Sequence, residues 1–251
     1  MAGPRSPAHP ARWPEGRRAA LSITFDDARP SQLDAGMPIL AEHGVRATCY
    51  VLPGPLQRRL PDWRAVVAAG HEIGNHSRSH PCAGNFPFSR NNALEDHTLD
   101  RIERDIVAAN DAIERLLGVT PATFAYPCGQ KIVGRGERAR CYVPVVARHF
   151  VIGRGFRDEV PNDPQRCDLA QIAGIEMDGA DPKRLCALVD EAVAGGAWLV
   201  LCGHEVGAPG PQSVPAASLA ALAEHAARRA DVLWTDTVAA VGGHLAGQRP
   251  A

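Results

Sequence analysis

Two acidic residues stand side by side at the end of the first predicted strand. The apolar run at residues 20–25 predicts a strand, and Asp26 and Asp27 follow it directly. Adjacent carboxylates repel each other, and a cation beside them relieves that repulsion. Asp is also common in turns. The pair therefore indicates either a cation-dependent site or a solvated turn.

A second polar cluster follows the strand predicted at residues 71–75, where His76 and His80 stand four positions apart. One helical turn would bring both imidazoles to the same side. Two His and one carboxylate leave coordination open for water, which is the pattern of a catalytic Zn²⁺ site. A surface role explains the pair equally well, and its position after a strand is what favours metal binding.

A third polar residue, His204, follows the strand predicted at residues 197–202. One interpretation is a core histidine hydrogen-bonded to the backbone. The other is a proton donor for a leaving group, because His fills that role near neutral pH.

The elements that must position these residues alternate along the chain. Strands are predicted at residues 20–25, 45–52, 71–75, 122–126, 150–153, 171–177, 197–202 and 231–234. The strongest helical pattern spans residues 99–117 and ends at Gly118. This alternation predicts a parallel sheet covered by helices, either a barrel or a doubly wound sheet. In both architectures, chemistry lies at the carboxyl ends of the strands, where the three polar clusters stand.

The composition narrows the class of protein. The chain has 251 residues, of which 45% are hydrophobic and 22% charged, which excludes a disordered chain or a coiled coil. A net charge of −1 without a basic stripe argues against a nucleic-acid partner. The sequence shows no membrane-spanning apolar run and no secretory signal, so we expect a cytoplasmic protein without a membrane partner. We expect its seven cysteines to be free thiols.

Four motifs together resemble the polysaccharide deacetylases of carbohydrate esterase family 4, also called the NodB-homology domain. They are TFDD at 24–27, HSRSH at 76–80, FAYPCG at 124–129 and WLVLCGH at 198–204, in the family's order. The resemblance implies a distorted (β/α) barrel of about seven parallel strands. It also implies one catalytic domain at residues 19–251, preceded by an irregular lead-in at residues 1–18.

The resemblance implies a role for each matched side chain. Asp27, His76 and His80 are expected to bind one divalent metal, most often Zn²⁺, with Co²⁺, Ni²⁺, Fe²⁺ or Mn²⁺ as alternatives. Asp26 corresponds to the general base that deprotonates the attacking water. His204 corresponds to the general acid that protonates the leaving amine or alcohol.

The third motif implies an oxyanion contact from the backbone N–H of Cys128. The family usually carries an aromatic residue at this position, but a backbone donor tolerates a changed side chain. Tyr126, Phe86 and Phe88 are candidates for contacts with substrate or for support of the site.

The sequence departs from the family pattern in two places. The family's third motif usually starts with an Arg that pairs with the catalytic Asp, and Ala125 occupies that position here. Arg154, just past the strand at residues 150–153, is the candidate partner of Asp26, although an ordinary surface Arg would look the same. The family's motif that supports the acid His cannot be recognised in this sequence. Asp178 is the candidate to orient His204.

The leading functional hypothesis is a metal-dependent hydrolase that removes acetyl groups from N- or O-acetylated carbohydrate. An alternative uses the same site on a small cyclic amide, ureide or imide. The shape around the loop at residues 81–92 distinguishes the two, because an open groove suits a glycan and a closed pocket a small molecule. A metal- or glycan-binding protein without catalysis is disfavoured, since both Asp26 and His204 are present.

Overall fold

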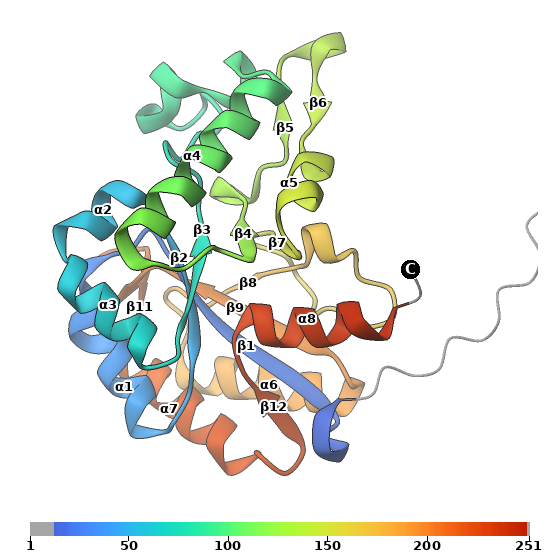
Figure 1. The fold of residues 1–251 in the computed structure, drawn as a ribbon. Helices are drawn as coiled ribbons and strands as arrows, with labels where there is room; N and C mark the ends of the chain where they lie inside the picture. The colour runs from blue at the N-terminus through green and yellow to red at the C-terminus, as the bar shows by residue number, and fades with distance from the viewer. Residues whose placement is uncertain (1–12, 250–251) are drawn as a thin grey trace, which may run out of the picture.

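The computed structural model describes residues 13–249 and shows a curled parallel sheet with helices packed around it (Figure 1). The strands of this sheet are β1 (Ala19–Asp26), β2 (Ala47–Val51), β3 (Glu72–Asn75), β4 (Thr123–Ala125), β7 (Ile152–Arg154), β8 (Ile175–Glu176), β9 (Trp198–Gly203) and β12 (Leu233–Thr235). They form one eight-stranded sheet in the order β7-β4-β3-β2-β1-β9-β8, with β12 also paired to β1.

Eight α-helices longer than one turn lie within the described residues: α1 (Met37–Glu42), α2 (Pro53–Arg58), α3 (Leu60–Ala68), α4 (Leu99–Leu117), α5 (Val143–His149), α6 (Pro182–Gly195), α7 (Ala216–Arg228) and α8 (Val238–Gln248). Two small strand pairs stand apart from the main sheet: antiparallel β5 (Ile132–Val133) and β6 (Arg140–Cys141), and parallel β10 (Glu205–Val206) and β11 (Ser213–Val214).

The sheet curls far enough for its two edges to meet. A single parallel bridge between Arg154 and Ile172 joins β7 to the segment that leads into β8. On the other side of the ring, β2 pairs with the carboxyl half of β1 and β12 with its amino half. The predicted distorted (β/α) barrel is thus confirmed, with eight paired strands where about seven were expected.

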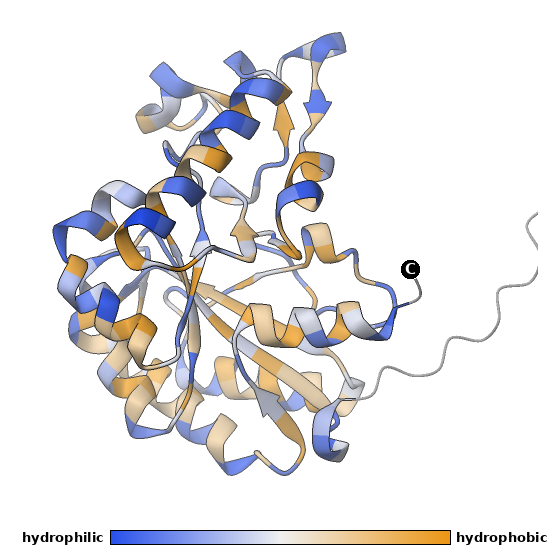
Figure 2. Ribbon diagram, viewed as in Figure 1, coloured by the Kyte–Doolittle hydropathy of each residue, from blue (hydrophilic) through white to orange (hydrophobic). Residues whose placement is uncertain are grey.

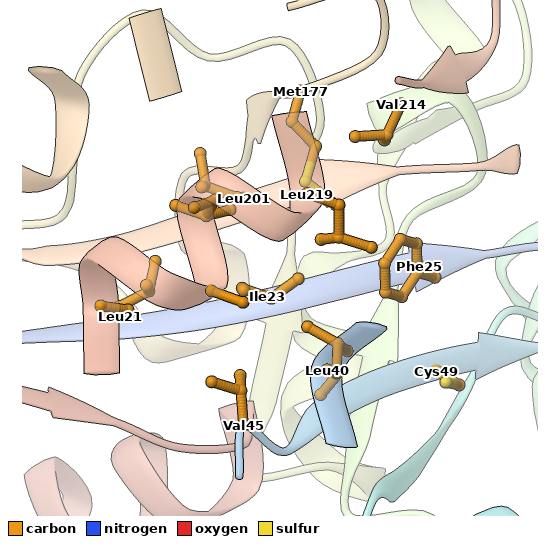
Figure 3. Close-up of a cluster of buried hydrophobic side chains, with 14 of the residues drawn as sticks. Leu21, Ile23, Phe25, Leu40, Val45, Cys49, Met177, Leu201, Val214 and Leu219 are labelled. Carbon is orange, nitrogen blue, oxygen red and sulfur yellow. The ribbon is translucent and has the colours of Figure 1, made fainter. Parts of the chain in front are cut away.

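The central strand β1 separates the apolar shell from the barrel interior. Leu21, Ile23 and Phe25 alternate along β1 and belong to the large buried core. Figure 3 shows these three residues near Leu40 of α1, Leu201 of β9 and Leu219 of α7. Because side chains of a strand alternate between faces, Asp26 lies on the opposite face from Phe25, together with Ser22 and Thr24.

Helix α4 forms where the apolar spacing predicts it. Ile102, Ile106 and Ile113 are buried on one face, Thr98 caps the first turn and Gly118 ends the helix in a left-handed conformation. Figure 2 shows hydrophobic and hydrophilic residues alternating along α4, whereas β9 is mostly hydrophobic. The one-sided pattern predicted from the sequence is confirmed.

Helix α8 packs against side chains that face the barrel interior. Val238, Val241 and Leu245 of α8 form a buried cluster with Ile152 and Trp198. The close approach depends on Gly242 of α8, because a Cβ there would lie 2.4 Å from Ile152 Cγ1. This helix therefore fills the end of the barrel away from the carboxyl ends of the strands.

The structure covers only part of the lead-in expected at the amino-terminal end. Residues 1–12 of the expected irregular lead-in lie outside the described residues. Trp13 is buried and its Nε1 donates a hydrogen bond to the Gly196 carbonyl at 3.3 Å. The division into a lead-in and one domain stays a prediction. Across residues 13–249, no helix has the length and apolar character needed to cross a membrane.

The expectation that all cysteines are free thiols is wrong. Cys82 and Cys128 form a disulfide, while Cys49, Cys141, Cys167, Cys186 and Cys202 are free. The two partners stand 46 positions apart, without a CxxC or comparable signature. They meet only because the loop after β3 and the turn after β4 emerge at the same edge of the sheet.

Candidate active site

The carboxyl ends of β1, β3 and β9 meet at one cavity of about 660 Å³. Side chains from all three predicted polar clusters line it: Asp26, Asp27, His76, His80 and His204. This convergence follows from parallel pairing, because neighbouring parallel strands end at the same edge of the sheet.

Asp26 and Asp27 reach the same cavity because the backbone turns between them. A continuing strand would send successive side chains to opposite faces. Asp27 instead has a φ of 73°, in the left-handed region that Asp tolerates better than most residues. Its Oδ1 lies 3.6 Å from His76 Nε2, and Asp26 Oδ2 lies 3.9 Å from that same nitrogen.

Asp27, His76 and His80 form a compact set of potential metal ligands. Both imidazoles point Nε2 at Asp27 Oδ1, each at 3.6 Å. His76 Nδ1 lies 2.9 Å from the Ala125 carbonyl, so that nitrogen carries the proton and Nε2 is free to bind an ion. Burial and the neighbouring His76 lower the pKa of His80 to about 4, which keeps its ring neutral as a ligand must be. The donor set fits a divalent metal.

The segment between the two histidines is a loop and not a helical turn. Ser77 and His80 both have positive φ values, of 66° and 50°. Helix α4 holds the loop, since Asp105 Oδ2 accepts hydrogen bonds from the backbone N–H groups of Arg78 and Ser79 at 2.9 and 3.2 Å. These bonds bring the imidazoles together, with ring centroids 4.8 Å apart.

Arg154 forms a buried ion pair with Asp26. The Arg154 side chain is 0% exposed, and its Nη2 donates to Asp26 Oδ1. Burial alone would raise the pKa of Asp26, but the charges of Arg154, His76 and His204 outweigh it, and the net pKa is lowered. Asp26 is therefore ionised, as a proton acceptor must be.

The sheet register explains how Arg154 replaces the arginine of the third motif. Ala125 on β4 pairs directly with Arg154 on β7. A side chain from Arg154 thus starts one strand away from where the family's Arg would start. Space for it comes from Gly174, where a Cβ would lie 2.7 Å from Arg154 Cδ and 2.5 Å from the Gly155 carbonyl oxygen.

His204 is fixed by the residue expected to orient it. Asp178 accepts twice from His204, from the backbone N–H at 3.0 Å and from Nδ1 at 2.6 Å. Burial lowers the pKa of His204, but the bond to Asp178 and the charge of Asp26 outweigh burial and raise it. Phe156 packs edge-on against the imidazole, with centroids 5.4 Å apart. His204 Nε2 stays available at the cavity, 3.5 Å from Gln212 Nε2.

The third motif supplies one cavity residue and one residue buried below it. Cys128 lines the cavity and has a φ of 54°. Tyr126 is fully buried and donates its hydroxyl to the Ala170 carbonyl at 2.7 Å. Tyr126 is not among the residues that line the cavity, and its contacts within the protein are packing contacts and this hydrogen bond.

Two residues near the site were not predicted from the sequence. Gln32 Nε2 donates to the backbone carbonyls of Asp26 at 2.6 Å and His204 at 2.9 Å, which ties the ends of β1 and β9 together. Arg29 donates to Asp27 Oδ2 at 2.9 Å from Nη2 and 3.2 Å from Nε. An Arg two positions after the acidic pair is the only hint that the sequence offers for either contact.

The loop at residues 81–92 forms one wall of the cavity. Phe86 and Phe88 line it, and Phe88 is 67% exposed. The rings pack together with centroids 5.4 Å apart, and Phe88 also approaches His80. The cavity is therefore open to solvent along this wall.

The curled parallel sheet, with its polar cluster at the carboxyl edge, places the chain among the (β/α) barrel proteins. Residues 14–135 match the family model of polysaccharide deacetylase. The resemblance seen in the four motifs is confirmed, because this segment is similar to the polysaccharide deacetylases.

Individual relatives agree with that family. A chitooligosaccharide deacetylase of Rhizobium leguminosarum bv. trifolii is 35% identical over 94 residues, which are 37% of this chain and 39% of that protein. The chain spans less than half the length of the curated relatives it matches.

Solved structures show the same fold over nearly the whole chain. A putative polysaccharide deacetylase from Mycobacterium smegmatis superposes with a TM-score of 0.67 at 19% identity, covering 98% of this chain and 99% of that one. An acetyl xylan esterase from Clostridium thermocellum, determined with a cobalt ion, gives 0.57 at 19% identity over 92% and 96% of the two chains.

Replacing His80 tests the metal set. His80→Ala removes one of three ligands, so metal content after dialysis should fall well below that of the wild type by elemental analysis. His149→Ala, which alters a histidine paired with Glu103 on the surface, is the matched control and should keep full metal content. Full occupancy in His80→Ala would refute the ligand assignment.

Replacing Arg154 tests the ion pair. Arg154→Met keeps much of the side-chain volume but leaves Asp26 buried without its cation, which should destabilise the fold by about 3–5 kcal/mol. Without that cation the pKa of Asp26 rises, so the acidic limb of kcat/KM should move to higher pH. Arg148→Met, on the surface beside Glu103, should leave the profile in place. An unshifted acidic limb in folded Arg154→Met would contradict the pairing.

Replacing Asp178 tests the support of His204. Asp178→Asn removes the carboxylate that raises the pKa of His204. The acid would then lose its proton at lower pH, so the basic limb of kcat/KM should move to lower pH while metal content is unchanged. Asp190→Asn, which faces His225 far from the cavity, provides the control. A basic limb at the wild-type pH would show that Asp178 does not tune the acid.

Proposed function

We propose that this chain is a metal-dependent hydrolase that removes acetyl groups from N- or O-acetylated carbohydrate. The observation that carries the proposal is that two separately supported groups, Asp26 on Arg154 and His204 on Asp178, line the same cavity as the three ligand side chains. A paired base and acid beside a metal set are what hydrolysis of an acetyl group requires.

Asp27, His76 and His80 would hold the ion. We propose Zn²⁺, because two imidazoles and one carboxylate are ligands typical of catalytic zinc, with Co²⁺, Ni²⁺, Fe²⁺ and Mn²⁺ as alternatives. When bound, such an ion acidifies water and polarises a carbonyl.

The chain's own groups then divide the proton transfers. Asp26 accepts the proton of the attacking water through the oxygen that Arg154 leaves unpaired. The backbone N–H of Cys128 stabilises the oxyanion that develops on the acetyl carbonyl. His204 gives its proton to the leaving amine or alcohol, and Asp178 stabilises the imidazolium before transfer. Acetate and a free amine or hydroxyl are the products.

The wall formed by Phe86 and Phe88 supports a saccharide substrate. An enclosed pocket would suit a cyclic amide, ureide or imide, but the exposed Phe88 leaves the cavity open on this side. Two of the similar proteins named above differ in the linkage that their names indicate: one is a chitooligosaccharide deacetylase and the other an acetyl xylan esterase. Both N-acetyl and O-acetyl linkages therefore stay within the proposal.

Compartment stays a prediction of the sequence alone. The Cys82–Cys128 disulfide argues against the expected cytoplasmic location, because such bonds persist in oxidising compartments.

Acetate release from three substrate classes tests the proposal directly. We expect turnover of acetylated chitooligosaccharide or acetylated xylooligosaccharide, loss of turnover with chelator and its recovery when Zn²⁺ is restored. Turnover of a cyclic ureide or imide with inert saccharides would instead support the alternative substrate class.

Replacing the proposed base separates chemistry from metal binding. Asp26→Asn cannot accept a proton, so turnover should fall by about 10²–10⁴-fold while metal content is retained. Asp34→Asn, an exposed carboxylate paired with Arg59, is the control and should keep wild-type turnover. Near-normal activity in Asp26→Asn would assign the base to another residue.

A further inference from the structure

His80 faces two different sets of potential ligands through its two ring nitrogens. Its Nε2 lies 3.6 Å from Asp27 Oδ1, on the side of the proposed catalytic ion. Its Nδ1 lies 3.7 Å from Cys82 Sγ, on the opposite side of the ring. Cys82 is itself bonded to Cys128. The Nδ1 edge of this imidazole therefore lies next to the disulfide.

The spacing of these atoms suits a second metal ion. The ligand atoms of His80, Cys82 and Cys128 all lie within 4.8 Å of one another. Bonds of about 2.0–2.1 Å to nitrogen and 2.3 Å to sulfur in a tetrahedron place the two ligand atoms about 3.6 Å apart. The observed separation of Nδ1 and Cys82 Sγ is 3.7 Å, so this pair already has the spacing that an ion requires, and breaking the disulfide lets the two sulfurs move apart.

We propose that, once the disulfide is reduced, Cys82, Cys128 and His80 form a second binding site for a thiophilic divalent cation such as Zn²⁺. A dithiol reductant supplies two electrons and two protons, the S–S bond breaks, and the reductant becomes a disulfide. Ion binding then releases the two thiol protons to solvent. When the proposed catalytic ion already holds Nε2, the Nδ1 proton of His80 leaves as well, and the ring bridges the two ions as an imidazolate. The site shares the His80 ring with the proposed catalytic ion, and its role lies outside the proposed deacetylation.

The backbone around both cysteines is held without the disulfide. The Cys82 N–H donates to Ser89 Oγ at 2.8 Å, and the Cys82 carbonyl accepts from the Leu94 N–H at 3.0 Å. On the other side, the Gly129 N–H donates to the Tyr126 carbonyl at 2.8 Å. Reduction therefore leaves the two thiols facing each other and His80, because each is anchored by its own loop.

The cavity gives the pair a path to solvent. Cys128 lines the cavity, whereas Cys82 is fully buried behind it. A reductant can attack at Cys128 and an ion can enter by the same route. Three protein ligands would leave the fourth position of a tetrahedral ion free for water or another ligand.

Cobalt titration of the full chain tests the proposal. The protein is reduced, freed of reductant under anaerobic conditions, checked for folding by circular dichroism and titrated with Co²⁺ alone. We expect about one more ion per chain than in the oxidised protein, and a thiolate-to-cobalt charge-transfer band in the near ultraviolet that the oxidised protein lacks. The absence of both in folded, reduced protein would overturn the proposal.

Variants identify the ligands and separate this site from the catalytic one. Cys82→Ser and Cys128→Ser should each lose the band, while Cys141→Ser, which removes an exposed free cysteine, should keep it. His76→Ala should weaken binding at the proposed catalytic set and keep the band, so the two hypotheses can fail independently. A band that persists in the Cys82→Ser, Cys128→Ser double variant would place the thiolate ligand elsewhere and refute the site.

Discussion

The buried ion pair between Asp26 and Arg154 is the interaction on which the arrangement of the site depends. A carboxylate inside a barrel is tolerated only when a cation and hydrogen bonds compensate its lost hydration. The surroundings of Arg154 serve that purpose: its guanidinium lies over the Tyr50 ring at 4.9 Å and donates to the Gly155 carbonyl at 2.8 Å. Gly174 leaves the space through which the side chain passes.

The position of that arginine shows what an ion pair requires of a fold. Ala125 and Arg154 are register partners on β4 and β7, so the cation that pairs with Asp26 comes from the strand next to the third motif. The constraint acts on the place where the guanidinium ends, and the strand from which it starts can change. A motif defined by consecutive residues misses such an exchange, whereas the need of Asp26 for a cation predicts it.

Much of the fold and part of the site were predictable for local reasons. The apolar runs of β1 and β9 and the one-sided apolar spacing of α4 indicate in the sequence which residues are buried. Contacts between distant loops have no such pattern in the sequence. Neither the disulfide of Cys82 with Cys128 nor the bonds from Gln32 to two strand ends follow from spacing, because only the closed sheet brings these residues together. His76 and His80 were identified by type, but their loop geometry comes from contacts with α4.

The same electrostatic arrangement serves both proton transfers. Burial opposes the charged form of Asp26 and of His204, yet Arg154 lowers the pKa of the first and Asp178 raises the pKa of the second. Each also acts on the other, since the carboxylate favours the imidazolium and the imidazolium favours the carboxylate. Neighbours that push the two pKa values apart leave a pH range in which the base is ionised while the acid is protonated. The barrel thus holds both groups in their reactive forms because each has a fixed partner of opposite charge: Arg154 at the end of β7 for Asp26, and Asp178 just past β8 for His204.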